Sequence, residues 1–326
     1  MDDVSAIVLS NGEACTARAL ACLDRQTLRP AETILVGPEV SPFYRAFNAG
    51  AAQVETEFFV QVDSDMVLDD TCLQSLRSRV TERVGMVSGL LRDPLLTRVM
   101  GVHLFRTECV RATAYTDSVV PESDFSTAMQ DAGWLLICAV APEKPASERN
   151  TYGVHDPGYT LESTFSKFLV TGSQIRRRGV GVRARSFLQQ LLTSRHPHAI
   201  IACLAAARGY TLALQDDFPR PFPVGPESAF LEAFFSGPDR VPPASVAQLD
   251  LTTTDWRQLF EAAARVGQEL HRRPSPGALV RTMRAVYEAP CLASFAALTG
   301  LCDGLFRDLG SADARYDYAH LVRLLN

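Results

Sequence analysis

The first ninety residues alternate between two hydrophobic patterns. Uninterrupted apolar runs, rich in β-branched and aromatic residues, predict three buried strands, at 4–9, 33–36 and 57–62. Between these runs, apolar residues recur at helical spacing over 14–23 and 43–52. Strands that alternate with helices in this way predict right-handed βαβ units and a mainly parallel sheet.

The pattern continues downstream and then changes. It predicts a helix from about Asp69 to Arg83, strands at 86–90 and 99–105, a helix at 121–133 and a strand at 134–141. From Tyr159 onward helical patterns dominate, and proline-rich breaks interrupt them. We therefore expect an α/β domain over residues 1–215 and a helical domain over residues 216–326.

Composition excludes several classes of protein. The chain has 326 residues, of which 47% are hydrophobic, and this is typical of a globular protein. Its 32 basic and 37 acidic residues give a net charge of −5, so no positive field is available for nucleic acid. The eight cysteines never form a C-x-x-C pair, and this argues against a zinc knuckle. We interpret them as small buried residues of a protein in a reducing compartment. The longest apolar runs are too short to span a bilayer, so we expect a cytoplasmic protein without a transmembrane segment.

Two carboxylates follow the third predicted strand, in the sequence Asp63-Ser64-Asp65. In a parallel sheet, ligands bind beyond the carboxyl ends of the strands. Two carboxylates that flank one residue repel each other unless a cation neutralises them, and Mg²⁺ and Mn²⁺ prefer such oxygen ligands. An isolated pair of this kind is more often a solvated turn with capping aspartates, so the rest of the sequence must decide between the two interpretations.

Further segments occur in a fixed order around this pair. They are Ser10-Asn11, Asn48-Ala49-Gly50, the run from Glu57 to Asp65, Gly101 to Arg106, Pro121 to Phe125 followed by Gly133-Trp134, and Val154-His155-Asp156. In this order and spacing they resemble the family 2 glycosyltransferases of the GT-A fold. The resemblance covers roughly residues 4–175, about half of the chain.

The resemblance implies a fold, a reaction and a donor. The fold is a GT-A domain with a Rossmann-like, mainly parallel central sheet, followed by a helical C-terminal region. The reaction is an inverting transfer of a sugar from a nucleotide sugar, with UDP as the expected nucleotide, to an acceptor hydroxyl. The acceptor can be a glycan, a lipid-linked sugar or a protein, and the sequence indicates neither the donor sugar nor the oligomeric state.

The resemblance also implies site residues. A divalent metal ion, Mn²⁺ or Mg²⁺, is expected on Asp65, with Asp63 and His155 as further ligands. The family usually has an aspartate at the end of the second strand, whereas this chain continues from Val36 into Gly37-Pro38-Glu39, so Glu39 is the expected substitute. The residues expected to bind the nucleotide are Ser10, Asn11, Glu39, Asn48, Asp63 and Ser64.

The chemistry of the reaction requires a base as well as a cation. Loss of a nucleoside diphosphate places negative charge on the leaving group, which a divalent ion stabilises. The acceptor hydroxyl must lose its proton during attack, and this needs a carboxylate. The resemblance implies Glu122 as the first choice for this base, since it aligns with the second acidic residue of the family's motif, and Asp124 is the second choice. Both positions also suit the first turn of a helix for purely electrostatic reasons. His155 could likewise be an ordinary surface histidine in a loop.

Two other interpretations stay open. The chain could be a catalytically inactive GT-A-like protein that binds a nucleotide sugar or a partner, or a nucleotidyltransferase on a related sheet. The second is less favoured because no glycine- and lysine-rich phosphate loop is present near the N-terminus. The arginines at 176–178, 183 and 185 could meet a diphosphate, an anionic acceptor or a membrane surface, although a solvated helix end is the simpler interpretation.

Overall fold

The protein forms two compact units, Met1–Gly158 and Tyr159–Asn326. This is a computed structural model that describes residues 3–118, 120–139, 151–177, 187–188, 190–212, 225–238, 249–253, 255–288, 291–306 and 309. The division lies between the last strand and the following helix, whereas the sequence places a domain limit near residue 216. The extent of a catalytic domain over 1–215 stays a prediction.

The first unit is a mixed sheet with helices on both faces. Its strands are β1 (Val4–Leu9), β2 (Thr33–Val36), β3 (Phe58–Asp63), β4 (Met66–Leu68), β5 (Val84–Asp93), β6 (Thr97–Arg106), β7 (Leu135–Cys138) and β8 (Thr151–His155). Its helices are α1 (Thr16–Asp24), α2 (Phe43–Ala51), α3 (Cys72–Arg77), α4 (Thr107–Ala112) and α5 (Pro121–Asp131). The expected α/β fold with a mainly parallel sheet is confirmed, since four of the seven strand pairings are parallel.

The order of the strands shows that the sheet curls. The strands lie in the order β2-β1-β3-β6-β5-β8-β4, and β7 pairs separately with β5. Only Ser64 and Asp65 separate β3 from β4 along the chain, yet the two strands stand far apart in this order. The sheet therefore curls back so that β8, at the end of the unit, lies beside the chain that leaves β3.

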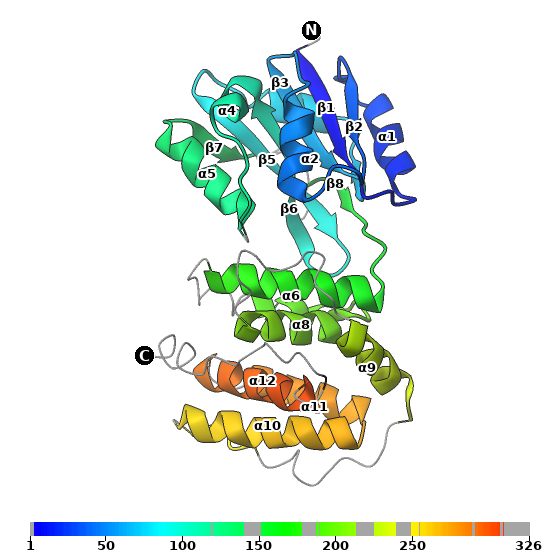
Figure 1. Ribbon diagram of the computed structural model, residues 1–326, viewed down its shortest axis with the longest axis vertical. Coiled ribbons are helices and arrows are strands. Elements are labelled where there is room, and N and C mark those ends of the chain that lie inside the picture. The colour runs from blue at the N-terminus through cyan, green and yellow to red at the C-terminus, as the bar shows by residue number, and fades with distance from the viewer. Residues whose placement is uncertain are drawn as a thin grey trace. The chain divides into compact units, whose positions relative to one another are not determined.

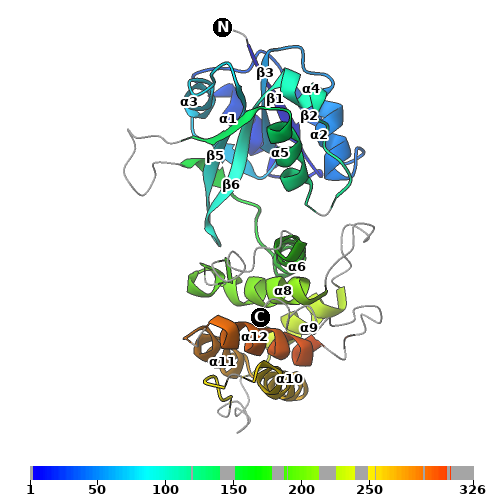
Figure 2. The same cartoon turned by 90° about the vertical axis from the view of Figure 1, so that its left-hand side faces the viewer.

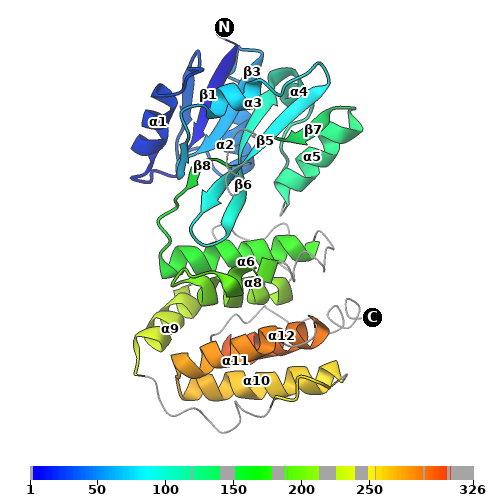
Figure 3. The ribbon, with the colours of Figure 1, turned by 180° about the vertical axis from the view of Figure 1, so that it is seen from behind.

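Two apolar layers cover the sheet. Strand β1 sends Val4, Ala6 and Val8 to one face, where they pack with residues of α1 and α3. The opposite face packs against α2, α4 and α5. Figure 1 shows α2 and α5 in front of the sheet, and Figure 3 shows α1 and α3 on the other side. Burial on both faces explains why β1 and β3 are continuous apolar runs rather than alternating ones.

Strands β5 and β6 form a long antiparallel hairpin, which the sequence pattern did not predict (Figure 2). Strand β5 is the branch point of the sheet, because its first half pairs with β7 and its second half with β8. Strands β4 and β8 were also not predicted, and the helix expected over 69–83 is shorter, at Cys72–Arg77. The last residues of the strand expected at 134–141 lie outside the described part of the chain.

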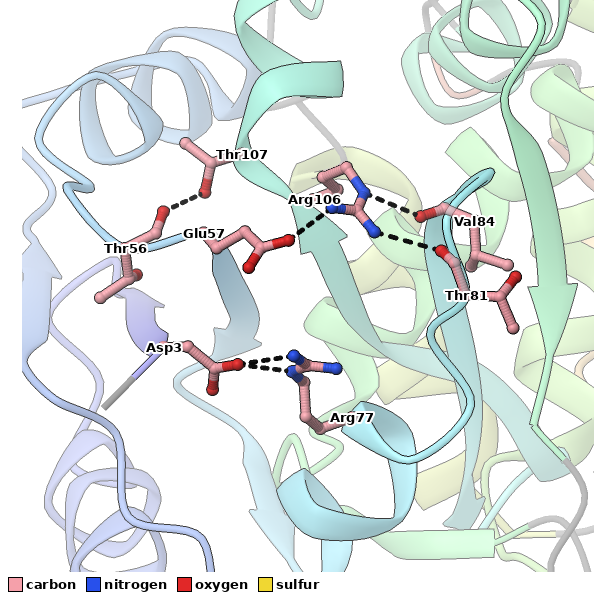
Figure 4. A network of polar contacts seen from close by, with 8 residues as sticks. All are labelled: Asp3, Thr56, Glu57, Arg77, Thr81, Val84, Arg106 and Thr107. Atoms are coloured by element: carbon pink, nitrogen blue, oxygen red, sulfur yellow. Dashed lines mark hydrogen bonds and ion pairs between the residues drawn. The ribbon is translucent and has the colours of Figure 1, made fainter. Parts of the chain in front are cut away.

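Two arginines bind the residues that precede β1 and β3, at the end of the sheet opposite to Asp63 (Figure 4). Arg77 donates to Asp3 Oδ2 at 2.9 and 2.6 Å, and Arg106 donates to Glu57 Oε1 at 2.6 Å. Their guanidinium carbons lie 4.2 and 4.7 Å from the centre of the Phe58 ring, within the range of cation–π attraction. Figure 4 also shows backbone carbonyls accepting from Arg106 and from a threonine, namely those of Thr81, Val84 and Thr56.

The second unit is helical, as expected. Its described helices are α6 (Leu161–Arg177), α8 (Ala199–Leu212), α9 (Gly225–Ser236), α10 (Trp256–Arg272), α11 (Pro276–Glu288) and α12 (Cys291–Phe306). Glycines allow two pairs of these helices to approach closely. A Cβ atom on Gly209 of α8 would lie 1.8 Å from the carbonyl oxygen of Leu169 in α6, and one on Gly304 of α12 would lie 1.9 Å from that of Ala264 in α10.

No helix in the described ranges is both long and apolar enough to cross a membrane. Of the arginine cluster, Arg178, Arg183 and Arg185 lie outside these ranges. Arg176 donates to the carbonyl oxygen of Tyr210 at 3.1 Å, so this side chain links α6 to α8.

Candidate functional site

Polar residues gather at the carboxyl ends of the three parallel strands. The register places Leu9 of β1 opposite Val36 of β2 on one side and Asp63 of β3 on the other. The N–H of Ser64 donates to the carbonyl oxygen of Leu9 at 2.9 Å, which continues this pairing by one residue. The loops that follow these strands therefore meet at one edge of the sheet, where an open α/β sheet binds its ligands.

A pocket of about 210 Å³ lies at this edge. Three segments line it, each of which follows one of the parallel strands: Leu9, Ser10, Asn11 and Glu13; Val40 to Phe43 with Ala46; and Asp63 to Asp65. Its wall thus combines apolar side chains with carboxylate, amide and hydroxyl groups. Such a wall can hold a small polar ligand with one flat apolar part.

Asp63 lies in an unfavourable environment for a negative charge. Burial, followed by the charges of Asp65 and Glu122, raises the pKa of Asp63 to about 7, although His155 and a hydrogen bond from Gln61 act in the opposite direction. The Gln61 Nε2 donates to Asp63 Oδ1 at 2.6 Å. A carboxylate with so high a pKa would gain from a cation, because positive charge offsets both the burial and the neighbouring carboxylates.

Asp65 and His155 face each other. His155 is the last residue of β8, where its backbone pairs with Met66, so it does not lie in the loop that the sequence predicted. Its Nε2 lies 3.1 Å from Asp65 Oδ2, and its side chain is only 8% exposed. The Nδ1 on the other side of the ring lies 2.6 Å from Asp93 Oδ2.

The donor atoms partly match the expected metal site. No group of three or more His, Cys, Asp or Glu side chains that could hold a metal ion occurs in the described part of the chain. Asp65 and His155 nevertheless supply one carboxylate oxygen and one ring nitrogen, 3.1 Å apart at the edge of the site. Such a pair fits an Mg²⁺ or Mn²⁺ ion that takes its other ligands from phosphate and water, which is how these ions usually bind. Asp63 as a third ligand stays a prediction.

Glu13 is a site residue that the sequence analysis missed. Its Oε2 accepts from Ser64 Oγ and from the N–H of Asn11, both at 2.8 Å. Burial acts to raise the pKa of Glu13, but these hydrogen bonds outweigh it and the pKa lies below its ordinary value. The side chain of Ser10 lies in the same network, 2.7 Å from Thr16 Oγ1. Glu13 therefore joins the loop after β1 to the turn between the two aspartates.

The two acids of α5 have different surroundings. The Oδ2 of Asp124 accepts from Ser118 Oγ, which lies just before the helix, at 2.5 Å. This contact ties the first turn of the helix to the preceding segment, which is a structural role. Glu122, two residues nearer to the helix start, is exposed, and its charge raises the pKa of Asp63. Between these two candidate bases, Glu122 is the one whose charge reaches the strand-end acids.

Asn48 holds the chain segment that leads to α5. Its Nδ2 donates to the carbonyl oxygen of Tyr115 at 2.9 Å, and its Oδ1 accepts from the N–H of Tyr115 at 3.1 Å. The Tyr115 ring then stacks on Phe125 of α5, with ring centres 4.2 Å apart and planes 13° apart. Burial, then the charges of Glu122 and Asp63, raises the pKa of Tyr115.

Neither Asn48 nor Glu39 belongs to the pocket wall described above. The exposed Glu39 folds back over Gly37, where its carboxylate occupies the space of a Cβ. The neighbouring residues Val40 to Phe43 line the pocket instead. Binding of a nucleotide by Glu39 and Asn48 stays a prediction.

Comparison with protein-family models and with curated proteins gives no match. Among solved structures, the chain is similar to residues 1–349 of S. aureus TarS in complex with UDP-GlcNAc, at 12% identity and a TM-score of 0.36. The UDP complex matches at 12% identity and a TM-score of 0.33, and TarS 1–349 alone at 11% and 0.33. Each match covers 93% of this chain and 90% of the other. A likeness at this level assigns no activity to the chain, so its function has to be argued from the site.

Proposed function

We propose that the protein is a glycosyltransferase that transfers a sugar from a nucleotide sugar to an acceptor hydroxyl. One observation carries the proposal: Asp63, Asp65 and His155 converge at the carboxyl edge of the sheet, beside a pocket, and the charge of Glu122 reaches Asp63. The proposed diphosphate site and the candidate base are thus linked by the effect of the Glu122 charge on Asp63. The resemblance of the sequence to family 2 glycosyltransferases points to the same chemistry.

The pocket is the proposed site of the nucleoside. Phe43, Val40 and Ala46 give it an apolar side, which suits a flat base, and Ser10, Asn11 and Asp63 give it polar groups for a ribose. UDP is the expected nucleotide because of the resemblance. The diphosphate would then reach Asp65, in the pocket wall, and His155 next to it.

Asp65 and His155 are the proposed metal ligands. A divalent cation bound there would supply positive charge to the departing diphosphate. Asp63 would hold the ribose or a water molecule near the ion, since burial and the neighbouring carboxylates, which raise its pKa, favour a partner that offsets its charge. The pairing of β8 with β4 fixes both ligands, because His155 ends β8 and Asp65 directly precedes β4.

Glu122 is the proposed base. It would accept the proton of the acceptor hydroxyl as the oxygen attacks the anomeric carbon, while the bond to the diphosphate breaks. A single displacement of this kind inverts the anomeric configuration. Glu122 stands in the first turn of α5, which Pro121 begins and which Gly133, with φ +87°, follows.

Release of nucleoside diphosphate tests the proposal. The wild-type protein would be incubated with a panel of UDP-, GDP- and dTDP-sugars, Mn²⁺ and simple glycan acceptors, and the released diphosphate measured. We expect release from one nucleotide class, a loss of about 10²- to 10⁴-fold in turnover for Glu122→Gln, and UDP affinity unchanged. The matched control is Asp124→Asn, two residues away on the same helix, which should lose less than threefold.

Two results would contradict the proposal in different ways. Equal turnover of Glu122→Gln and the wild type would exclude Glu122 as the base. UDP binding without diphosphate release from any sugar would favour a catalytically inactive protein that binds nucleotide sugars.

A further inference from the structure

Asp93 is a buried carboxylate behind the proposed metal ligands. It is the last residue of β5, its side chain is 0% exposed, and its Oδ2 lies 2.6 Å from Nδ1 of His155. A carboxylate in the interior is costly unless it is hydrogen-bonded or paired. Its position is therefore informative, because a residue with no role at the site could be replaced by an apolar one.

The backbone around Asp93 keeps its carboxylate in one orientation. The other oxygen, Oδ1, accepts from the N–H groups of Leu95 and Leu96, at 2.8 and 2.6 Å, in the turn between β5 and β6. These two N–H donors stabilise the ionised form of the Asp93 carboxyl group, and an ionised carboxylate can only accept hydrogen bonds. The hydrogen between Asp93 and His155 therefore belongs to the ring nitrogen.

We propose that Asp93 is a positioning residue that keeps the ring hydrogen of His155 on Nδ1, so that Nε2 carries no hydrogen and can bind a divalent cation together with Asp65. This proposal rests on the proposed function. A neutral imidazole has one hydrogen, so the nitrogen that keeps it determines which nitrogen can act as a ligand. Asp93 also fixes the plane of the ring, since Nδ1 and Nε2 face Asp93 and Asp65 on opposite sides.

The curled sheet supplies this arrangement. Strand β5 carries Asp93 and strand β8 carries His155, and the two strands pair in parallel near their ends, with Arg92 opposite Val154. On its other side, β8 pairs with β4, which begins directly after Asp65. Strands β5 and β8 thus carry Asp93 and His155 side by side, and the short turn between β3 and β4 holds Asp65 next to them.

Asp93→Asn changes the hydrogen bonding and little else. The asparagine carbonyl can still accept from the two backbone N–H groups, whereas its amide would donate toward Nδ1 of His155. The ring hydrogen would then move to Nε2, where it blocks the cation. The matched control is Asp156→Asn, which removes the same charge one residue after His155, from a side chain that is 43% exposed and pairs with Arg18.

Mn²⁺ binding would be measured by electron paramagnetic resonance on the full chain, in the presence of saturating UDP. We expect Asp93→Asn to weaken Mn²⁺ binding by about 10- to 100-fold, the usual effect of removing such a carboxylate, and Asp156→Asn by less than twofold. UDP affinity without metal should not change in either variant. In the His155→Ala background, Asp93→Asn should have no further effect on Mn²⁺ binding, because the two residues act through one contact.

A second measurement does not depend on the variants. Nitrogen chemical shifts of His155 in the wild-type protein with Mg²⁺ and UDP report which ring nitrogen carries the hydrogen. We expect it on Nδ1, and a hydrogen on Nε2 would overturn the proposal. Wild-type Mn²⁺ affinity in Asp93→Asn, or an equal loss in the His155→Ala background, would overturn it too.

The metal site and the positioning role of Asp93 can fail separately. If His155→Ala weakens Mn²⁺ binding and Asp93→Asn does not, only the positioning role of Asp93 is wrong. If the wild type binds no Mn²⁺ with UDP present, the metal site of the proposed function is wrong and the role of Asp93 is overturned with it.

Discussion

The raised pKa of Asp63 predicts a cost in stability that a single substitution should remove. In the folded protein, burial and the charges of Asp65 and Glu122 raise the pKa of Asp63 to about 7. In the unfolded chain, an aspartate has a pKa of about 3.9. Asp63→Asn keeps the shape of the side chain and an oxygen for the hydrogen bond from Gln61, and it removes the charge.

The size and the sign of the effect follow from proton linkage. The two pKa values differ by about 3, and each pH unit corresponds to about 1.4 kcal/mol, so the cost is at most roughly 4 kcal/mol. Well below pH 4 the carboxyl group is protonated in both states and costs nothing, and near pH 4 the cost is still small. Between pH 4 and 7 the folded state binds more protons than the unfolded state, so the contribution of Asp63 to stability falls as pH rises, and above pH 7 the cost is constant.

The assay needs a probe of the first unit alone. The chain has two tryptophans, Trp134 in the first unit and Trp256 in the second, so a Trp256→Phe background makes fluorescence report on the first unit. Urea unfolding of this background and of its Asp63→Asn form would be compared at pH 4 and pH 8, in the presence of a chelator.

We expect Asp63→Asn to be more stable than its background by about 2 to 4 kcal/mol at pH 8 and equally stable at pH 4. Equal stability at both pH values would refute the reasoning, because it would mean that Asp63 is charged in the folded protein at no cost. A variant less stable at pH 8 would refute it as well.

Two other substitutions test how the fold supports the site. Asn48→Ala removes both hydrogen bonds to the backbone of Tyr115, so we expect the free energy of urea unfolding to fall by about 1 to 3 kcal/mol. Turnover should fall more than UDP affinity, because the segment that leads to α5 and Glu122 is no longer held. Undiminished turnover would contradict this. Gly209→Ala places a Cβ against the carbonyl oxygen of Leu169, so α6 and α8 must separate. In a Trp134→Phe background, where Trp256 alone reports, the second unit should lose about 1 to 3 kcal/mol of stability. An unchanged urea midpoint of that unit would contradict this prediction, because the two helices would then accommodate the added methyl group without loss.

Local signals in the sequence were sufficient for part of the site. The apolar runs that form β1, β2 and β3 end where the structure ends them, within a residue, so Asp63 could be placed at the edge of the sheet in advance. Pro121 and Gly133 likewise mark the ends of the helix that carries Glu122. These features depend on a few neighbouring residues, and such signals can be read directly from a sequence.

Contacts between distant segments explain what the sequence analysis missed. Gly153 and Pro157 flank His155 and suggested a loop, yet the pairing of β8 with β4 makes this segment a strand. A Cβ on Gly153 would lie 2.4 Å from the carbonyl oxygen of Val67, so this glycine permits a close approach of two strands rather than a turn. The part played by Asp93 depends on the same curl of the sheet, which no local pattern encodes.

The central claim is that Asp65 belongs to a cation-dependent nucleotide site. The most direct test is a thermal-shift titration with UDP, with and without Mn²⁺, on the wild type, on Asp65→Ala and on Asp70→Ala as a nearby exposed control. At about 100 times its dissociation constant, a ligand adds about 2.7 kcal/mol of stability, which such an experiment resolves. The account predicts that UDP with Mn²⁺ stabilises the wild type and the control, and that Asp65→Ala loses this effect. Equal stabilisation of all three proteins, or stabilisation of none, would contradict it.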